Sequence, residues 1–119
     1  MVLTSDSIDV YNPKTVRSAM GSLFRVKITS VRDFSSFISS AIECGRHVYA
    51  AELTDGAMAL DEINTSSKDI FIIGNEGHGI PKEVSGICSG SVYIPISKRT
   101  ESLNASVAAA IFMWEIGKK

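Results

Sequence analysis

The stretch DIFIIGNEGHGIP at residues 69–81 contains the most apolar of the strand-like runs, followed by glycines at positions 74, 77 and 79. A short apolar run bounded by polar and glycine residues is typical of a strand buried on both faces of a parallel sheet. We therefore expect residues 69–74 to form a central strand. The glycines predict a loop after this strand whose backbone passes very close to another group.

Outside this stretch, apolar runs alternate with helix-like segments. Further strands are expected at 26–28, 47–53 and 91–96. Helices are expected at 12–22, 33–45 and 104–116, with one turn starting at Pro81 and at most a short helix at 57–63. This alternation predicts the α/β class, with a parallel sheet flanked by helices.

Side-chain spacing indicates which helix faces are buried. Asp33 is the expected cap of the helix at 33–45. Its apolar residues recur at helical spacing: Phe34, Phe37, Ile38, Ala41 and Ile42. In the helix at 104–116, the residues available for packing are Val107, Ala108, Ile111, Met113 and Trp114.

The chain has 119 residues, of which 45% are hydrophobic and 21% are charged, values typical of one globular domain. Twelve basic and 13 acidic residues give a net charge of −1, which argues against bulk attraction to nucleic acid or to a membrane surface. Charge is nevertheless uneven, because five bases and no acid lie between Lys14 and Arg32. This cluster is either a solvated surface or a face that contacts phosphates.

Two cysteines, Cys44 and Cys88, cannot form a disulfide framework and predict reduced thiols. The chain start lacks the features of a secretion signal, and no apolar run approaches the ~20 residues of a membrane helix. We therefore expect a cytoplasmic protein without a membrane segment. His47 and His78 have no neighbouring cysteine, so no metal is expected.

The glycine spacing in residues 72–81 is G-x-x-G-x-G. It differs from the dinucleotide fingerprint G-x-G-x-x-G and lacks the Gly-Lys-Ser/Thr of a Walker loop, so a phosphate cradle is poorly supported. The loop follows a strand of a parallel sheet, where ligands bind in open α/β folds. A ligand-binding loop and a plain turn therefore both remain possible on this pattern.

Two other segments could contribute to a site. In YIPISKRTESLNASVAAA, residues 93–110, Ser102 or Asn104 is either a simple helix cap or part of a pocket at the helix start, with Lys98 and Arg99 on its rim. In YNPKTVRSAMGSLFRV, residues 11–26, Arg17 belongs either to a capped surface helix or to a functional face.

Together these segments resemble the SpoU-type family of RNA ribose 2′-O-methyltransferases, in the SPOUT class. IFIIGNEGHGIPKEV and VYIPISKRTESLNASVAAAIFMWE match the family's last two signature motifs in content, order and separation. Residues 11–26 are similar to its middle segment. The resemblance implies a parallel α/β sheet with a C-terminal trefoil knot, S-adenosylmethionine as cofactor, tRNA or rRNA as substrate, and a homodimer.

The resemblance also implies roles for individual residues. Those expected to bind the cofactor are Leu53, Gly74, Asn75, Gly77, Ile94, Pro95, Ile96 and Leu103. Those expected to shape the catalytic site are Glu76, Ser102 and Asn104. Those expected to contact RNA are Arg17, Lys98 and Arg99.

The family also has an earlier Asn…Arg motif, which this sequence does not contain. We therefore expect residues 1–119 to be a single SpoU-type domain that lacks its N-terminal portion, with little activity of its own. One alternative is a fragment that binds S-adenosylmethionine or RNA without catalysis. Another is a flavodoxin-like nucleotide-binding module, for which only TSDS at residues 4–7 offers phosphate-binding hydroxyls.

Overall fold

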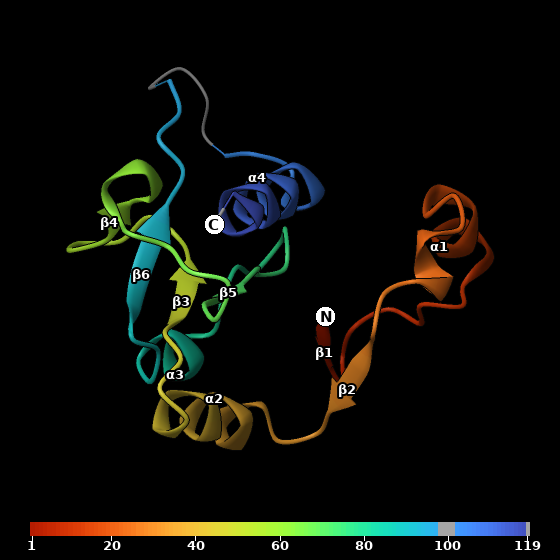
Figure 1. The fold of residues 1–119 in the computed structure, drawn as a ribbon, viewed down its shortest axis with the longest axis horizontal. Helices are drawn as coiled ribbons and strands as arrows, with labels where there is room; N and C mark the ends of the chain where they lie inside the picture. Colours follow the sequence, from red (N-terminus) through yellow and green to blue (C-terminus); the bar gives the residue numbers. More distant parts are fainter. Residues whose placement is uncertain (98–101, 119) are drawn as a thin grey trace. The chain divides into compact units, whose positions relative to one another are not determined.

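The computed structural model describes residues 1–97 and 102–118. The chain divides into two compact units, Met1–Phe37 and Ile38–Lys119, which are described separately below. Helices and strands alternate along the chain, as Figure 1 shows. Within residues 1–97 and 102–118, all strand pairs are parallel, which confirms the predicted α/β class with a parallel sheet.

The first unit contains a two-stranded sheet of β1 (Val2–Thr4) and β2 (Thr29–Val31). Between them lie the helix α1 (Pro13–Ser18) and the 3-10 helix η1 (Ser22–Phe24). Asn12, the first residue of the helix expected at 12–22, caps α1, since its side-chain oxygen accepts the backbone N–H of Lys14 at 3.0 Å.

The strand predicted at 26–28 is wrong by three residues. The register with β1 pairs Val2 with Thr29 and Thr4 with Val31, so the strand begins where its partner begins. Val26 lies before the paired segment with its side chain exposed. Pairing with a distant strand sets this boundary, and the local run of apolar residues does not reveal it.

The second unit contains a four-stranded sheet in the order β4-β6-β3-β5. Its strands are β3 (Val48–Ala51), β4 (Met58–Ala59), β5 (Ile70–Ile72) and β6 (Gly90–Tyr93). The expectation that the most apolar strand is central is wrong, because β5 is an edge strand of this sheet. β5 is apolar because other segments pack against both faces of the sheet at this strand. It is not apolar because strands flank it on both sides.

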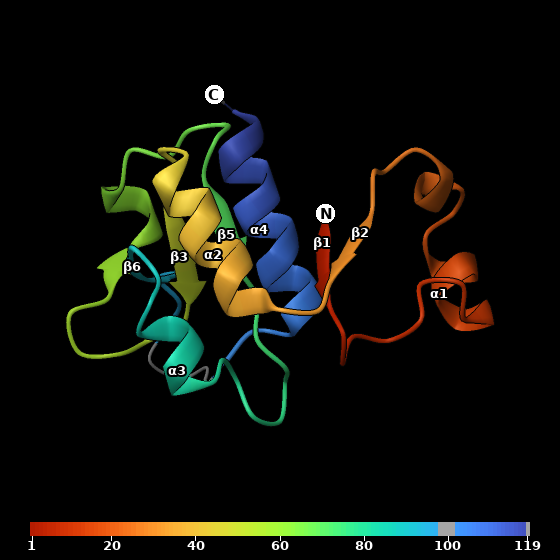
Figure 2. The same cartoon turned by 90° about the horizontal axis from the view of Figure 1, so that it is seen from below.

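Helices α2 (Phe34–Glu43) and α4 (Ala105–Gly117) lie on opposite faces of this sheet, with the short α3 (Lys82–Ser85) on the α2 side (Figures 1 and 2). Asp33 caps α2, since its carboxylate accepts the backbone N–H of Ser36 at 2.9 Å. Residues 57–63, where at most a short helix was expected, contain the strand β4 and the 3-10 helix η2 (Leu60–Glu62). No helix within the described residues has the length and apolar character needed to cross a membrane.

The core residue of α4 is Phe112, which the predicted packing set did not include. Phe112 is buried in a cluster with Leu60 and Val92, and its ring stacks on Phe71 with centroids 4.6 Å apart. Trp114, expected to pack, is 70% exposed, and Met113 is also exposed. Because α4 is apolar around most of its circumference, residue spacing does not reveal which side faces the sheet.

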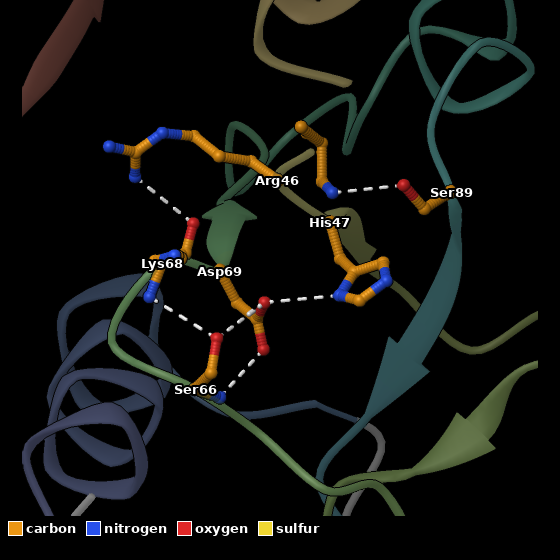
Figure 3. Close-up of polar contacts among 7 residues, drawn as sticks. Arg46, His47, Ser66, Lys68, Asp69 and Ser89 are labelled. Atoms are coloured by element: carbon orange, nitrogen blue, oxygen red, sulfur yellow. Dashed lines mark hydrogen bonds and ion pairs between the residues drawn. The ribbon is translucent and has the colours of Figure 1, made fainter. Parts of the chain in front are cut away.

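A polar network connects the residues that precede the strands at the amino end of the sheet (Figure 3). The buried carboxylate of Asp69 accepts the backbone N–H of Ser66 at 2.8 Å and lies 3.2 Å from Nδ1 of His47. Burial, followed by the charge of Asp69, raises the pKa of Tyr49. The strand expected at 47–53 includes His47, but this residue precedes β3 and its side chain is mostly exposed.

Candidate functional site at the carboxyl edge of the sheet

The loops that contain most of the predicted site residues leave the sheet at the same end, where the strands have their carboxyl termini. This end is called the carboxyl edge. Strands β3, β5 and β6 are parallel, so their carboxyl ends lie together. Since β3 lies between β5 and β6, the loop that starts at Glu52 lies between those that start at Ile73 and Ile94. This edge is where open α/β sheets bind ligands.

The glycine loop, residues 74–80, folds tightly on itself. Asn75 and Gly79 exchange two backbone hydrogen bonds, with N–O distances of 3.2 and 2.8 Å. A Cβ atom on Gly74 would lie only 2.5 Å from the carbonyl carbon of Gly79, so no other residue fits there. The close approach that the glycines predict is therefore confirmed, and the neighbouring group is the loop's own backbone.

Asn75 also shapes this loop from within. Its side-chain oxygen accepts the backbone N–H of Gly77 at 2.7 Å. Because this backbone N–H of Gly77 is already bonded, it is not available to bind a phosphate. This agrees with the glycine spacing, which does not match a phosphate-binding loop. Asn75 and Gly77 therefore fix the shape of the loop, and contact of either residue with a cofactor stays a prediction.

Glu76 connects the glycine loop to the start of α4. Its Oε1 accepts Nδ2–H of Asn104 at 3.1 Å and lies 3.4 Å from the backbone N of Ala105. The carboxylate thus lies at the positive end of the α4 dipole, where a negative charge is stabilised. Two segments that are 28 residues apart in sequence, and that contain the two matched motifs, are joined by this contact.

Asn104 has a second role in the same place. Its Oδ1 accepts the backbone N–H of Ser106 at 2.9 Å, so of the two caps that the sequence allows, Ser102 and Asn104, it is Asn104 that caps the helix. The amide group therefore holds the helix start with its oxygen and the glycine loop with its nitrogen. A role in catalysis is not required to explain either contact, so that role stays a prediction.

The apolar residues expected to bind a cofactor differ in exposure. Leu53 is 77% exposed, and Ile96 is also exposed. Leu103 is half-buried, and Ile94 packs against the cluster of Leu60, Val92 and Phe112. Contact of these aliphatic side chains with a cofactor stays a prediction.

The remaining predicted residues take no part in the Glu76–Asn104 contact, or they lie outside the residues that the structure describes. Pro95 and Ser102 are exposed beside the site. Lys98 and Arg99 lie outside the described residues, so their expected contact with RNA stays a prediction. Arg17 is an exposed residue in the last turn of α1, within the first unit. The trefoil knot also stays a prediction, since residues 98–101 are outside the described part.

Glu52 is a residue at this edge that the sequence did not single out. It follows the last residue of β3, and its Oε1 accepts the hydroxyl of Ser91 at 2.9 Å. Burial is the first cause that raises the pKa of Cys88, and the charge of Glu52 is the second. An acidic residue directly after an apolar strand was the signal that could have identified it.

The described part of the chain contains no group of three or more His, Cys, Asp or Glu side chains placed to hold a metal ion.

The fold and the site define a parallel α/β protein whose loops at the carboxyl edge are joined by the contact of Glu76 with Asn104. The chain belongs to the SpoU rRNA Methylase family, which matches residues 1–114. The resemblance inferred from the motifs is therefore confirmed.

Known proteins agree with this assignment. The chain is 34% identical over 116 residues to the 23S rRNA (guanosine(2553)-2′-O)-methyltransferase RlmP of Bacillus subtilis, covering 98% of this chain and 46% of the relative. It thus spans about half the length of that protein. A TrmH-family structure from Porphyromonas gingivalis has 31% identity and a TM-score of 0.86, covering 99% of this chain and 48% of that one.

A third comparison includes the cofactor by name. The AdoMet-bound rRNA methyltransferase of Sinorhizobium meliloti is 29% identical, with a TM-score of 0.83, and the match covers 96% of this chain and 43% of that one. These likenesses extend across both units. They support the parallel α/β architecture expected from the sequence.

Proposed function

We propose that this chain is the cofactor-binding part of a methyltransferase that modifies ribose 2′-hydroxyl groups of RNA. The observation that carries the proposal is the contact of Glu76 with Asn104 and Ala105, which joins the family's two motifs at the carboxyl edge of the sheet. The names of the RlmP relative and of the AdoMet-bound structure support the reaction and the cofactor.

S-adenosylmethionine would supply an activated methyl group on a sulfonium. Leu53, Ile96 and Leu103 would provide apolar walls for its adenine, and the backbone near Gly74 and Ile94 would provide hydrogen bonds. This assignment fits a site with exposed aliphatic side chains and a loop too tight for a Cβ at position 74. Adenine recognition needs apolar contact and backbone hydrogen bonds more than charge.

The contribution of this chain to the reaction would be mainly positioning. Glu76 and Asn104 hold the glycine loop against the start of α4, and Ser102 lies just before that start. Arg17, Lys98 and Arg99 would contact RNA phosphates. When bound, S-adenosylmethionine would supply the methyl group to the ribose oxygen and would leave as S-adenosylhomocysteine, with the hydroxyl proton released to solvent.

The test uses the protein expressed from its complete gene, with tritiated S-adenosylmethionine and unmodified tRNA and rRNA. We expect label in RNA at nucleotides that become resistant to alkaline hydrolysis, because a methylated 2′ oxygen cannot attack the neighbouring phosphate. Cofactor binding without any transfer to RNA would favour the alternative of a non-catalytic module. Label on a base instead of a ribose would contradict the proposed reaction.

The proposal includes one domain and a homodimer. The family match across residues 1–114 includes both compact units, which supports their belonging to one domain. Exposed apolar residues on α4 support a dimer: a shallow cleft there is lined by Val107, Ala110 and Trp114, and Trp114 is largely exposed.

We expect Trp114→Glu to convert a dimer to a monomer, because a charge in an apolar interface is costly. Analytical ultracentrifugation measures the change. Ser39→Glu, at an exposed position on α2, is the matched control and should leave the dimer intact. A monomeric parent protein at micromolar concentration would contradict the dimer.

A further inference from the structure

The turn that connects α1 to η1 in the first unit is conformationally unusual. Met20 has a φ of 47°, and it is the sole non-glycine residue with a positive φ in the described part of the chain. Gly21 follows with a φ of 84°. The backbone N–H of Ser22 then bonds to the carbonyl of Ala19 at 2.9 Å, so the chain reverses sharply at the end of the helix. Positive φ at a non-glycine residue is a form of strain that clusters at functional sites.

This turn exposes large apolar side chains. Met20 is 90% exposed and Phe24 is 77% exposed. Two such side chains within five residues of one turn form a local apolar surface, which is a common feature of binding sites. An aromatic ring in this position offers a flat face on which another ring can stack.

The same turn is positively charged. Arg17 is in the last turn of α1, and Arg25 directly follows Phe24. Both arginines are exposed, and no residue between Lys14 and Arg32 is acidic. In the described part of the chain, none of the bases in this segment forms an ion pair with a carboxylate. Arginines without an ion-pair partner are complementary to the phosphates of a polyanion. The exposed ring between them is complementary to the flat, unstacked bases that such a polyanion can have.

We propose that residues 17–25, here called the basic turn, form a docking element for an unpaired RNA nucleotide. Phe24 stacks on the base, and Arg17 and Arg25 contact the phosphates on either side. Single-stranded RNA is recognised by this combination of aromatic stacking and arginine contacts. The inference rests on the proposed function, because it assigns a binding role toward the RNA substrate to residues outside the cofactor edge.

The experiment measures binding of a fluorescent single-stranded RNA by anisotropy, using the protein expressed from its complete gene at several salt concentrations. We expect Phe24→Ala to weaken binding by about tenfold with little change in salt dependence, since stacking is not ionic. Phe24→Trp should restore the affinity. Ile8→Ala, which removes another exposed apolar side chain of the first unit, should have no effect.

The arginines have a different signature. Arg17→Ala and Arg25→Ala should weaken binding and also reduce the slope of log affinity against log salt by about one each, because each removes a phosphate contact. Lys118→Ala, at the end of α4, is the matched control for loss of a positive charge. Calorimetry with S-adenosylhomocysteine should show unchanged cofactor affinity in all of these variants.

Two results would overturn the inference. Phe24→Ala that binds RNA as tightly as the parent shows that the ring does not stack on a base. A change of oligomeric state in Phe24→Ala, with RNA affinity unchanged, shows that a protein surface covers the ring. Either result leaves the proposed methyltransferase intact if the parent still modifies RNA, whereas a parent that neither binds nor modifies RNA contradicts both proposals.

Discussion

Gly74 shows how one missing side chain fixes the shape of the candidate site. A Cβ there would lie 2.5 Å from the carbonyl carbon of Gly79 and 2.8 Å from the backbone N of Ile80. These neighbours are backbone atoms that are held by the Asn75–Gly79 hydrogen bonds. The loop must therefore open to admit any other residue.

We expect Gly74→Ala to lower the free energy of unfolding by roughly 1–3 kcal/mol and to weaken binding of S-adenosylhomocysteine, because the loop is displaced from its packed position. Thermal denaturation and calorimetry measure the two effects. Gly117→Ala is the matched control, since nothing lies within 4 Å of its added Cβ. Equal behaviour of the two variants would contradict the structure assigned to the loop.

For single residues, the sequence predicts which positions have a special role better than it predicts which residues they contact. Three glycines after a strand indicate a close approach, and the structure confirms it. The sequence does not show that Glu76 bonds to Asn104, because the two residues are 28 positions apart and only the fold brings them together. Nor does the sequence show that Asn104 divides its amide between a cap and a loop.

Among the elements, α4 is the one whose start belongs both to a helix and to the site. Its cap has a counterpart at α1, where Asn12 makes the same kind of hydrogen bond to the backbone. The two asparagines differ in one respect. The side-chain nitrogen of Asn104 also donates to Glu76 at 3.1 Å, which links α4 to the glycine loop. Asn12 caps a helix of the first unit, which does not contain the glycine loop.

We expect Asn104→Ala and Asn12→Ala each to destabilise the protein by about 1 kcal/mol through loss of the cap. Asn104→Ala should in addition weaken S-adenosylhomocysteine binding, because the glycine loop loses its link to α4. Denaturant unfolding and calorimetry separate the two effects. If both variants bind the ligand as the parent does, the Glu76–Asn104 contact does not organise the site.

Most of the elements were predictable in type and order, but β1 and β4 were not expected. The extent and position of the others were not predictable either. Strands were expected to be longer than they are: residues 47–53 contain the four-residue β3, and the strand expected at 91–96 is β6, which runs from Gly90 to Tyr93. Strand ends depend on pairing with other strands, which local composition does not show. The edge position of β5 and the buried side of α4 likewise depend on tertiary packing.

For the molecule as a whole, the two ends of the four-stranded sheet have different roles. The amino end has the polar network of Asp69, Ser66 and His47, drawn in Figure 3. The carboxyl end has the candidate cofactor site. A network at one end should contribute to stability without taking part in ligand binding at the other.

We therefore expect Asp69→Ala to reduce the free energy of unfolding by roughly 1.5–3 kcal/mol, because a buried carboxylate and its hydrogen bonds are lost. Chemical denaturation measures this change. In the folded variant, the affinity for S-adenosylhomocysteine should stay within about twofold of the parent. A large loss of affinity would show that the two ends of the sheet are coupled.

Isothermal titration calorimetry of this chain tests directly whether S-adenosylmethionine binds at the carboxyl ends of the strands. Circular dichroism first establishes that the parent and the variants are folded. We expect S-adenosylmethionine and S-adenosylhomocysteine to bind to the parent and to Ile8→Asp. We expect neither to bind to Leu103→Asp, which places a charge against the adenine. The absence of heat and of a thermal shift at millimolar ligand, or equal binding by Leu103→Asp, would contradict binding at this site.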